Sequence, residues 1–166
     1  MKIRSATQSD LIRIAAIHAE SWQASYSDDL PDEFLNGPII RLFKRYWREI
    51  EIQDEDILLV AEENSMLGFV AVWCQPEPFI DNLHVTPSQR SKKVGTALMI
   101  AVAKELIKKG HETAFLWVFQ SNEKAIRFYE QLGGIQKEQA MKNVFGYDVL
   151  SRKIEWETLK KLTHHI

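Results

Sequence analysis

Apolar residues recur at three- and four-residue steps in four stretches of the chain, a period typical of amphipathic helices. In the first stretch, Leu11, Ile14, Ala15, His18, Trp22 and Tyr26 share one face. The Leu30-Pro31 pair ends this helix, and Asp32–Leu35 reads as a short helical turn. The four predicted helices are Leu11–Tyr26, Ile39–Ile52, Val94–Lys109 and Asn122–Leu132. Gly110 and the Gly133-Gly134 pair supply stop signals for the last two.

Shorter runs rich in β-branched and aromatic residues predict strands between these helices. The order of helices and strands predicts an α/β or α+β sheet with helices on both faces. The chain shows no internal repeat and no long linker, so we expect one domain over residues 1–166. The predicted strands are Lys2–Ala6, Ile57–Ala61, Leu67–Cys74, Phe79–Val85, Ala114–Phe119, Ile135–Met141 and Val144–Ile154.

Composition and charge narrow the class of protein. The 166 residues carry a formal net charge of -2, which argues against a general nucleic-acid binder. The chain contains one cysteine and no apolar leader or membrane-length run, so we expect a cytoplasmic protein without contact to a membrane. Cys74 has no nearby sequence signal for activation and is interpreted as a buried structural residue. No metal site is predicted.

The stretch HVTPSQRSKKVGTAL, residues 84–98, concentrates positive charge where a helix begins. Arg90, Lys92 and Lys93 precede the predicted helix at Val94, although the helix dipole already makes this end positive. A bound anion would resolve the conflict, because free backbone N–H groups at a helix start form an anion site. The P-loop and dinucleotide signatures are absent, which leaves an acyl-CoA pyrophosphate turn or a solvated basic turn.

Two motifs here resemble the GCN5-related N-acetyltransferases, the GNAT superfamily. The first is Arg90-Ser91-Lys92-Lys93-Val94-Gly95, similar to the family's Q/R-x-x-G-x-G/A, except that Lys93 replaces the first glycine. The second is FLWVFQSNEKAIRFYEQLGG, a strand followed by an Asn and a helix with a Tyr. The resemblance implies a mixed, mostly antiparallel sheet of about six or seven strands and an acetyl-CoA-dependent N-acetyltransferase acting by direct attack on a primary amine.

The resemblance also implies roles for individual residues. The strand before the turn would pair with the pantetheine arm, and one of its N–H groups would polarise the thioester carbonyl. Asn122 resembles the family's pantetheine contact, and Tyr129 its general acid, although Tyr129 also reads as a core residue. The implied cofactor-binding residues are Leu83, His84, Val85, Arg90, Ser91, Lys92, Lys93, Val94, Gly95, Thr96, Asn122 and Tyr129.

The base that would deprotonate the amine stays open between Asp81, His84, Glu77 in the preceding loop, and a water chain. Asp81 and His84 are three residues apart, so on a regular strand they are expected to point to opposite faces. Trp22 and Tyr26 are expected to bind the acceptor, beside an acidic loop containing Asp28 that would suit a cationic amine; a plain aromatic core is the alternative. The acceptor would be a small-molecule or peptide amine. A homodimer is possible, and a CoA-binding sensor without turnover is the alternative function.

Overall fold

The computed structural model describes residues 1–90 and 92–164. Its helices are α1 (Leu11–Ser25), α2 (Asp32–Leu35), α3 (Pro38–Glu49), α4 (Val94–Lys108), α5 (Glu123–Gln131) and α6 (Lys160–Thr163). Its strands are β1 (Lys2–Ser5), β2 (Ile57–Glu63), β3 (Ser65–Trp73), β4 (Phe79–Val85), β5 (Ala114–Phe119), β6 (Ile135–Val144) and β7 (Tyr147–Trp156). Within this part of the chain, no helix has the length and apolar character needed to cross a membrane.

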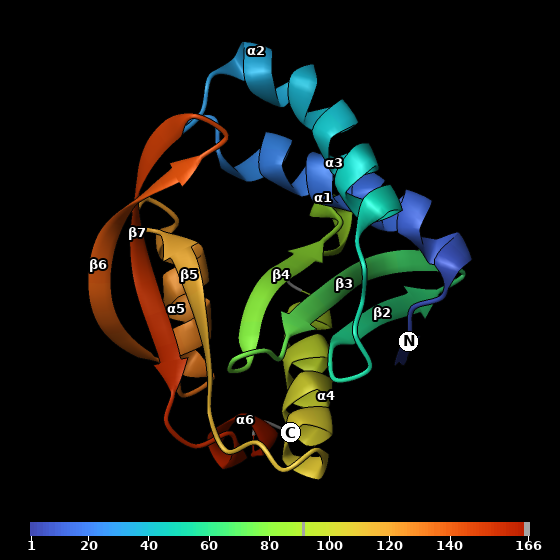
Figure 1. Cartoon of the computed structure of the whole chain (residues 1–166), viewed down its shortest axis with the longest axis vertical. Coiled ribbons are helices and arrows are strands. Elements are labelled where there is room, and N and C mark those ends of the chain that lie inside the picture. Colours follow the sequence, from blue (N-terminus) through green and yellow to red (C-terminus); the bar gives the residue numbers. More distant parts are fainter. Residues whose placement is uncertain (91, 165–166) are drawn as a thin grey trace.

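All seven strands form one sheet in the order β1-β2-β3-β4-β5-β7-β6 (Figure 1). Every neighbouring pair is antiparallel except β4 and β5, which run parallel. These two strands are registered at one position, Phe79 opposite Phe115, and then diverge. The predicted fold class, a mixed and mostly antiparallel sheet with helices on both faces, is confirmed.

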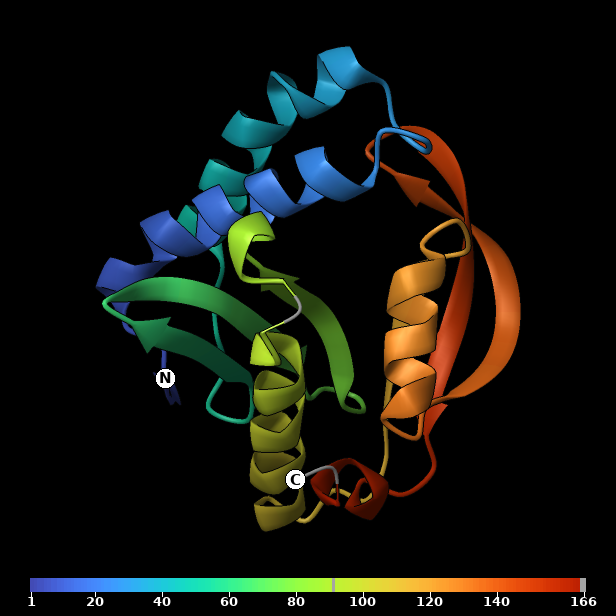
Figure 2. The same ribbon diagram turned by 180° about the vertical axis from the view of Figure 1, so that it is seen from behind.

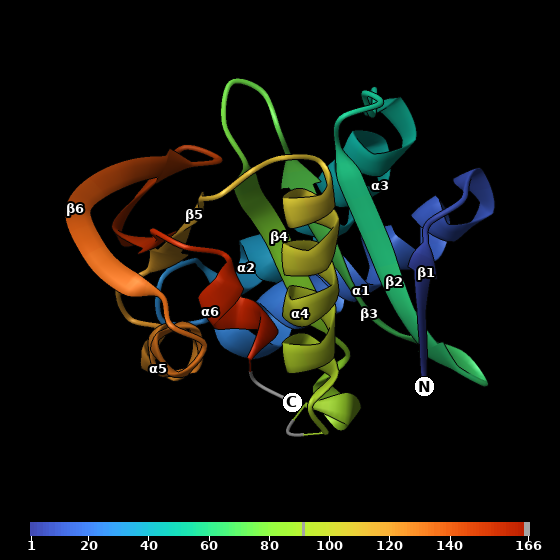
Figure 3. The ribbon, with the colours of Figure 1, turned by 90° about the horizontal axis from the view of Figure 1, so that it is seen from below.

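Helices cover the sheet in two layers, each with its own apolar cluster. On one face, α1 and α3 bury Ile14, Phe43 and Trp47 against β2 and β3. On the other face, α4 covers β2–β4 while α5 lies beside β5–β7 (Figure 2). Figure 3, seen from below, shows β6 curling around the side of the sheet that holds α5. The gap between β4 and β5 therefore has a helix on each side of it.

Several predicted boundaries are wrong for identifiable reasons. The helix predicted to reach Ile52 ends at Glu49, because Ile50 takes an extended ψ of 136°. The closing hairpin turns three residues later than predicted, at Phe145 and Gly146, which both have positive φ values. Ile107 lies in the apolar pattern that predicts α4, but its side chain is 37% exposed. Helix α6 was not predicted at all.

A β-bulge in β4 overturns the expected directions of Asp81 and His84. Ala71 faces Asn82 across the ladder, whereas the next residue, Val72, faces Ile80, so Asp81 is the extra residue. A bulge re-aims the side chain next to it. The Asp81 carboxylate accepts a hydrogen bond from Trp73 Nε1 at 2.8 Å, on the α1 and α3 face that also buries His84. The two side chains therefore share one face.

Gly68 allows β3 to approach β4 closely at this point. A Cβ added at position 68 would lie 2.7 Å from the backbone oxygen of His84, shorter than any real contact of this kind. Any larger residue at position 68 would push His84 outward. The position of His84 is thus set by the strand that precedes it in the chain.

Candidate functional site

The divergence of β4 and β5 opens a cavity of about 1030 Å³. One end reaches the start of α4 at Lys93, Val94 and Gly95, and the other end reaches Trp22 of α1 and Tyr26, which follows that helix. Tyr129 of α5 lines the stretch between these ends. The cavity thus connects the two regions that the sequence assigns to the cofactor and to the acceptor.

The backbone of β4 presents unpaired polar groups to this cavity. Thr86 N–H donates to Leu67 O of β3 at 2.8 Å. Because successive residues of a strand direct their backbone groups to opposite sides, Leu83 and Val85 direct theirs away from β3 and toward β5. Within the described residues, β5 is registered with β4 only at Phe79, so these groups have no sheet partner there. An extended ligand can add to this edge as a strand would.

The turn before α4 leaves a set of N–H donors free. Lys93 is the N-cap residue and makes no side-chain cap bond, and the first helical bond runs from Ala97 N–H to Lys93 O at 3.0 Å. The N–H groups of Val94, Gly95 and Thr96 precede that bond and have no intrahelical partner. All three residues line the cavity. This end of the cavity can therefore hold an anion.

Lys93 takes the left-handed conformation, with φ 61° and ψ 16°. This conformation favours glycine, the residue that the family motif has at this position. The chain thus keeps the backbone shape of the motif despite the change of residue. Lys92 is exposed and lies outside the cavity lining, and Ser91 lies outside the described residues.

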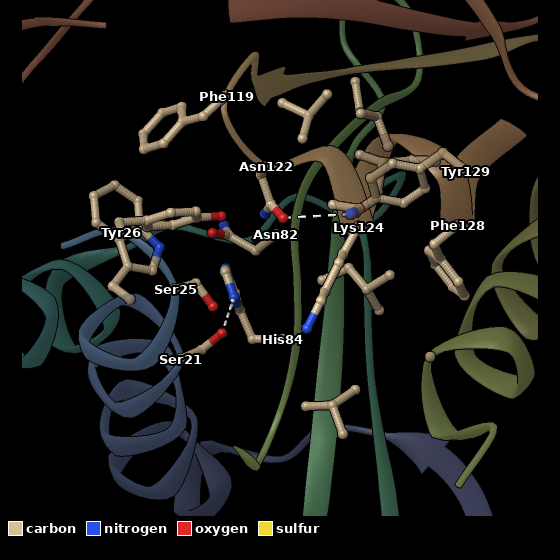
Figure 4. Close-up of a pocket in the computed structure, with 18 of the residues that line it drawn as sticks. Ser21, Ser25, Tyr26, Asn82, His84, Phe119, Asn122, Lys124, Phe128 and Tyr129 are labelled. Atoms are coloured by element: carbon tan, nitrogen blue, oxygen red, sulfur yellow. Dashed lines mark hydrogen bonds between the residues drawn. The ribbon is translucent and has the colours of Figure 1, made fainter. Parts of the chain in front are cut away.

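The Arg90 side chain extends from the turn before α4 toward α1. Its Nη2 donates to Ser21 Oγ at 3.0 Å and to Ser21 O at 3.4 Å. Ser21 Oγ also lies 2.9 Å from His84 Nδ1 (Figure 4). The buried Ser21 hydroxyl therefore joins the turn before α4 to the middle of β4.

His84 is buried and stacks on His18 of α1, with ring centroids 4.6 Å apart. Burial, with a smaller contribution from the Arg90 charge, lowers the pKa of His84 to about 3. Burial also lowers the pKa of His18 well below its usual value. His18 Nδ1 accepts from Trp47 Nε1 at 3.0 Å, so its proton is on Nε2. Both imidazoles are neutral at pH 7, and His84 is a weak base.

Asp81 lines the wall of the cavity. Its side chain is accessible to solvent from the cavity, yet protein atoms enclose much of its carboxyl group. Burial raises the pKa of its carboxyl, and the hydrogen bond from Trp73 opposes that rise. A carboxylate with a raised pKa accepts a proton more readily than an ordinary one. Of the two base candidates on β4, the chemistry therefore favours Asp81.

Tyr129 and Asn122 come from α5. The Tyr129 ring packs edge-on against Trp156 at 5.9 Å, and burial raises the pKa of its phenol, so the group stays protonated at neutral pH. Asn122 caps α5 by accepting from Ala125 N–H at 3.3 Å and also lines the cavity. Figure 4 shows both side chains on the β5 side of the gap, across from His84.

The acceptor end is aromatic. The Trp22 ring stands edge-on to Tyr26 at 5.1 Å, and Phe119 of β5 lies 4.5 Å from the Tyr26 ring. Trp22 Nε1 is buried and has no hydrogen-bond partner within the described residues. Asp28 lines the cavity, as the acidic-loop interpretation expects, whereas Asp29 accepts a hydrogen bond from Ser121 Oγ at 2.5 Å. Of these two loop carboxylates, only Asp28 lines the cavity.

Sequence analysis missed several residues that line the same cavity. Ser21 and Ser25 lie one turn apart on α1, and Asn82 shares the face of His84 two residues away on β4. Lys124 extends from the start of α5 into the cavity (Figure 4). The sequence signal for Asn82 was a polar residue inside an otherwise apolar strand.

Comparisons with known proteins agree with this geometry. The family described as Acetyltransferase (GNAT) matches residues 12–134. An uncharacterised N-acetyltransferase of Bacillus subtilis, YuaI, is 26% identical over 136 residues, covering 77% of this chain and 76% of that protein. The crystal structure of the PaiA N-acetyltransferase from Thermoplasma acidophilum, in complex with coenzyme A, has a TM-score of 0.70 at 21% identity, covering 91% of this chain and 96% of that one.

A further solved structure is yncA of Salmonella typhimurium with its cofactor acetyl-CoA. It has a TM-score of 0.67 at 20% identity and covers 96% of this chain and 94% of that one. These two structures support the fold, and the family match spans most of this chain, including both motifs. The chain therefore belongs to the GNAT acetyltransferase family and is an N-acetyltransferase.

Proposed function

We propose that this chain transfers the acetyl group of acetyl-CoA to a primary amine by direct attack, without a covalent enzyme intermediate. The observation that carries the proposal is the single cavity that joins the free N–H groups of α4, the open edge of β4 and the Tyr129 phenol. Acetyl-CoA, when bound, supplies a thioester as acetyl donor and a thiolate as leaving group.

The chain offers a fitting contact for each part of that molecule. The N–H groups of Val94, Gly95 and Thr96 would hold the pyrophosphate, helped by the dipole of α4 and the Lys93 ammonium. The backbone of Leu83 and Val85 would pair with the pantetheine arm. Asn122 would contact the same arm from the opposite side of the gap. The residues present thus match the shape and charge of the cofactor.

Three residues would manage protons and charge during transfer. An N–H of Leu83 or Val85 would donate to the thioester carbonyl oxygen and stabilise the charge that develops there. Asp81 would accept the proton of the amine, directly or through water, and Tyr129 would give its proton to the departing sulfur. Asp81 is preferred to His84 because His84 holds a proton so weakly.

A covalent route is disfavoured by the position of the cysteine. Cys74 is buried and is absent from the cavity lining. Burial, with the nearby Asp56 charge, raises the pKa of its thiol to about 11. The thiolate that would attack the donor is therefore scarce at neutral pH.

The test is acetyl-CoA-dependent thiol release with a panel of amino acids, peptides and polyamines. We expect release that survives Cys74→Ala. We also expect Asp81→Asn to lower kcat by about a hundredfold, the usual scale for a lost proton-transfer group. His84→Gln serves as the contrast on the same strand and should change kcat less. Full activity in Asp81→Asn would remove Asp81 from this role.

A CoA-binding sensor is the competing function. Both functions predict that CoA raises the melting temperature, by an amount that corresponds to about 2.7 kcal/mol at a hundredfold excess over Kd. Only the enzyme releases thiol in the presence of an amine. If CoA stabilises the protein but no amine in the panel is acetylated, the result favours the sensor function over the enzyme function.

A further inference from the structure

The far wall of the acceptor end holds a lysine whose charge nothing described in the chain neutralises. Lys142 of β6 places its ammonium 3.9 Å from the centre of the Trp117 ring on β5. Both residues line the cavity, and both are half-buried. Across residues 1–90 and 92–164, no carboxylate forms an ion pair with Lys142. An aromatic face attracts an ammonium group but accepts no conventional hydrogen bond from it, so the N–H donors of the lysine stay available.

A second lysine on the same face shows the contrast. Lys153 of β7 lies 4.7 Å from the centre of the Phe115 ring, two residues before Trp117 on β5. Its ammonium is 3.6 Å from a carboxylate oxygen of Glu138, and it does not line the cavity. Of these two lysines held over aromatic rings of β5, the one that faces the cavity is the one without a carboxylate partner.

A carboxylate lines the opposite wall of the cavity. Phe79 and Phe115 are opposite each other in the parallel strands, and Asp81 and Trp117 each follow two residues later, on strands that diverge from that point and enclose the cavity. Asp81 carries the negative charge on the β4 wall, and Lys142 sits over Trp117 on the other wall. The cavity therefore has a carboxylate on its β4 wall and an ammonium group above its β5 wall.

We infer that the acceptor carries a carboxylate as well as its amine, and that the carboxylate binds the Lys142 ammonium above Trp117 while the amine faces Asp81. This inference rests on the proposed acetyl transfer. A free amino acid has both groups in the required order, and aromatic surface from Trp117, Phe119 and Trp22 suits an apolar side chain beside them. The acidic-loop expectation, a purely cationic amine, fits this wall less well.

Losing a charge-assisted hydrogen bond in a partly buried site weakens binding by about tenfold to a hundredfold. The effect should appear only with acceptors that carry the carboxylate. The amine contacts Asp81 in either case, so acceptors without a carboxylate should not sense Lys142.

The experiment compares kcat/KM for each common amino acid with kcat/KM for the amino acid amide, in which a carboxamide replaces the carboxylate. Both series are measured with the wild-type enzyme and three variants. Lys142→Met should lower kcat/KM for the amino acids by about tenfold to a hundredfold, through KM, and leave the carboxamides within about twofold. Lys142→Arg keeps the cation and should retain the preference. Lys153→Met is the matched control outside the cavity and should change neither series. The comparison between variants cancels the difference in basicity between the two kinds of amine.

The outcomes separate this inference from the proposed function. If the wild-type enzyme acetylates carboxamides or polyamines as well as amino acids, or if Lys142→Met lowers both series equally, the carboxylate site is wrong and acetyl transfer stands. If CoA stabilises the protein but no amine reacts, acetyl transfer fails and the inference fails with it. Stabilisation by CoA in Lys142→Met shows that the variant is folded.

Discussion

Tyr129 illustrates how the environment of one side chain suits it to one role. Its ring is fixed by the edge of Trp156 and by the neighbouring Phe128, while the residue still lines the cavity. Burial disfavours the charged phenolate, which keeps the proton on the oxygen. A core position and the proposed role as proton donor are therefore compatible in the same residue.

We predict that Tyr129→Phe lowers kcat by about a hundredfold, since the proton donor is lost while the ring remains. The KM for acetyl-CoA should change little, and the melting temperature should stay close to that of the wild type. Steady-state kinetics and thermal unfolding measure the two effects. Tyr26→Phe, which removes a phenol from the acceptor end of the same cavity, is the control for loss of any hydroxyl. Unchanged kcat in Tyr129→Phe would exclude the acid role.

At the scale of elements, the start of α4 combines an anion site with local strain. The left-handed conformation costs a residue with a Cβ about 1–2 kcal/mol, whereas glycine adopts it freely but loses about 0.5–1 kcal/mol more conformational entropy on folding. Lys93 thus keeps its charge at the turn at a net cost in stability. The backbone donors and the side-chain charge are two separable contributions to anion binding.

We predict that Lys93→Gly stabilises the protein by about 0.5 kcal/mol, the difference between the strain removed and the entropy lost. If backbone N–H groups dominate the binding of CoA, its affinity holds or rises in this variant. If the Lys93 charge dominates, affinity falls and depends less on salt, because screening acts mainly on exposed charges. Urea unfolding and calorimetric titration of CoA at low and high salt measure both.

Lys92→Gly is the matched control for this turn. Lys92 is exposed and lies outside the cavity lining. This variant loses the same charge and leaves the left-handed residue Lys93 unchanged, so it should be less stable than the wild type. Equal stability changes in the two variants would contradict the strain at Lys93.

At the scale of the whole molecule, the packing of α1 on β4 buries two imidazoles against each other. His18 comes from the first helix and His84 from the fourth strand, and neither can gain a proton without disrupting the contact. The unfolded chain binds protons at both histidines once the pH falls below about 6.5. The folded state does not, so stability is complete above that pH and declines below it.

We predict that the free energy of unfolding falls by about 2 kcal/mol from His84 alone between about pH 7.5 and pH 5, with a further loss from His18. Asp10, whose pKa is lowered to about 2 by Arg4, loses its contribution only below about pH 4, so the histidines dominate this window. Asp81 has the opposite effect on the free energy of unfolding. Because its pKa is raised in the folded protein, its contribution to stability increases as the pH falls.

Urea unfolding at several pH values between these limits measures the effect. His84→Asn should flatten the dependence on pH, although the variant starts from a lower stability. His164→Gln, a change at an exposed histidine near the end of the described chain, should leave the slope as in the wild type. A wild-type stability that is flat over this range would contradict the neutral histidine pair.

The sequence by itself determined the seven strands, the helices other than α6, and the order of these elements. Period-two and period-3.6 patterns are local properties, so β4 and β5 were placed without error, and the turn before α4 could be identified from a helix start and a charge cluster. Lys93 and Gly95 mark that turn because backbone conformation at a helix start depends on a few adjacent residues. The family resemblance added the roles of Asn122 and Tyr129.

Only the tertiary structure decided which side chains meet. The bulge at Asp81 depends on how β4 pairs with β3, and it reversed the expected direction of that side chain. The contact of Ser21 with His84 and Arg90 joins residues 63 and 69 positions apart. The pKa of His84 and the position of Lys142 over Trp117 arise from burial and from pairing across three strands. Such contacts depend on long-range packing, which no local pattern in the sequence encodes.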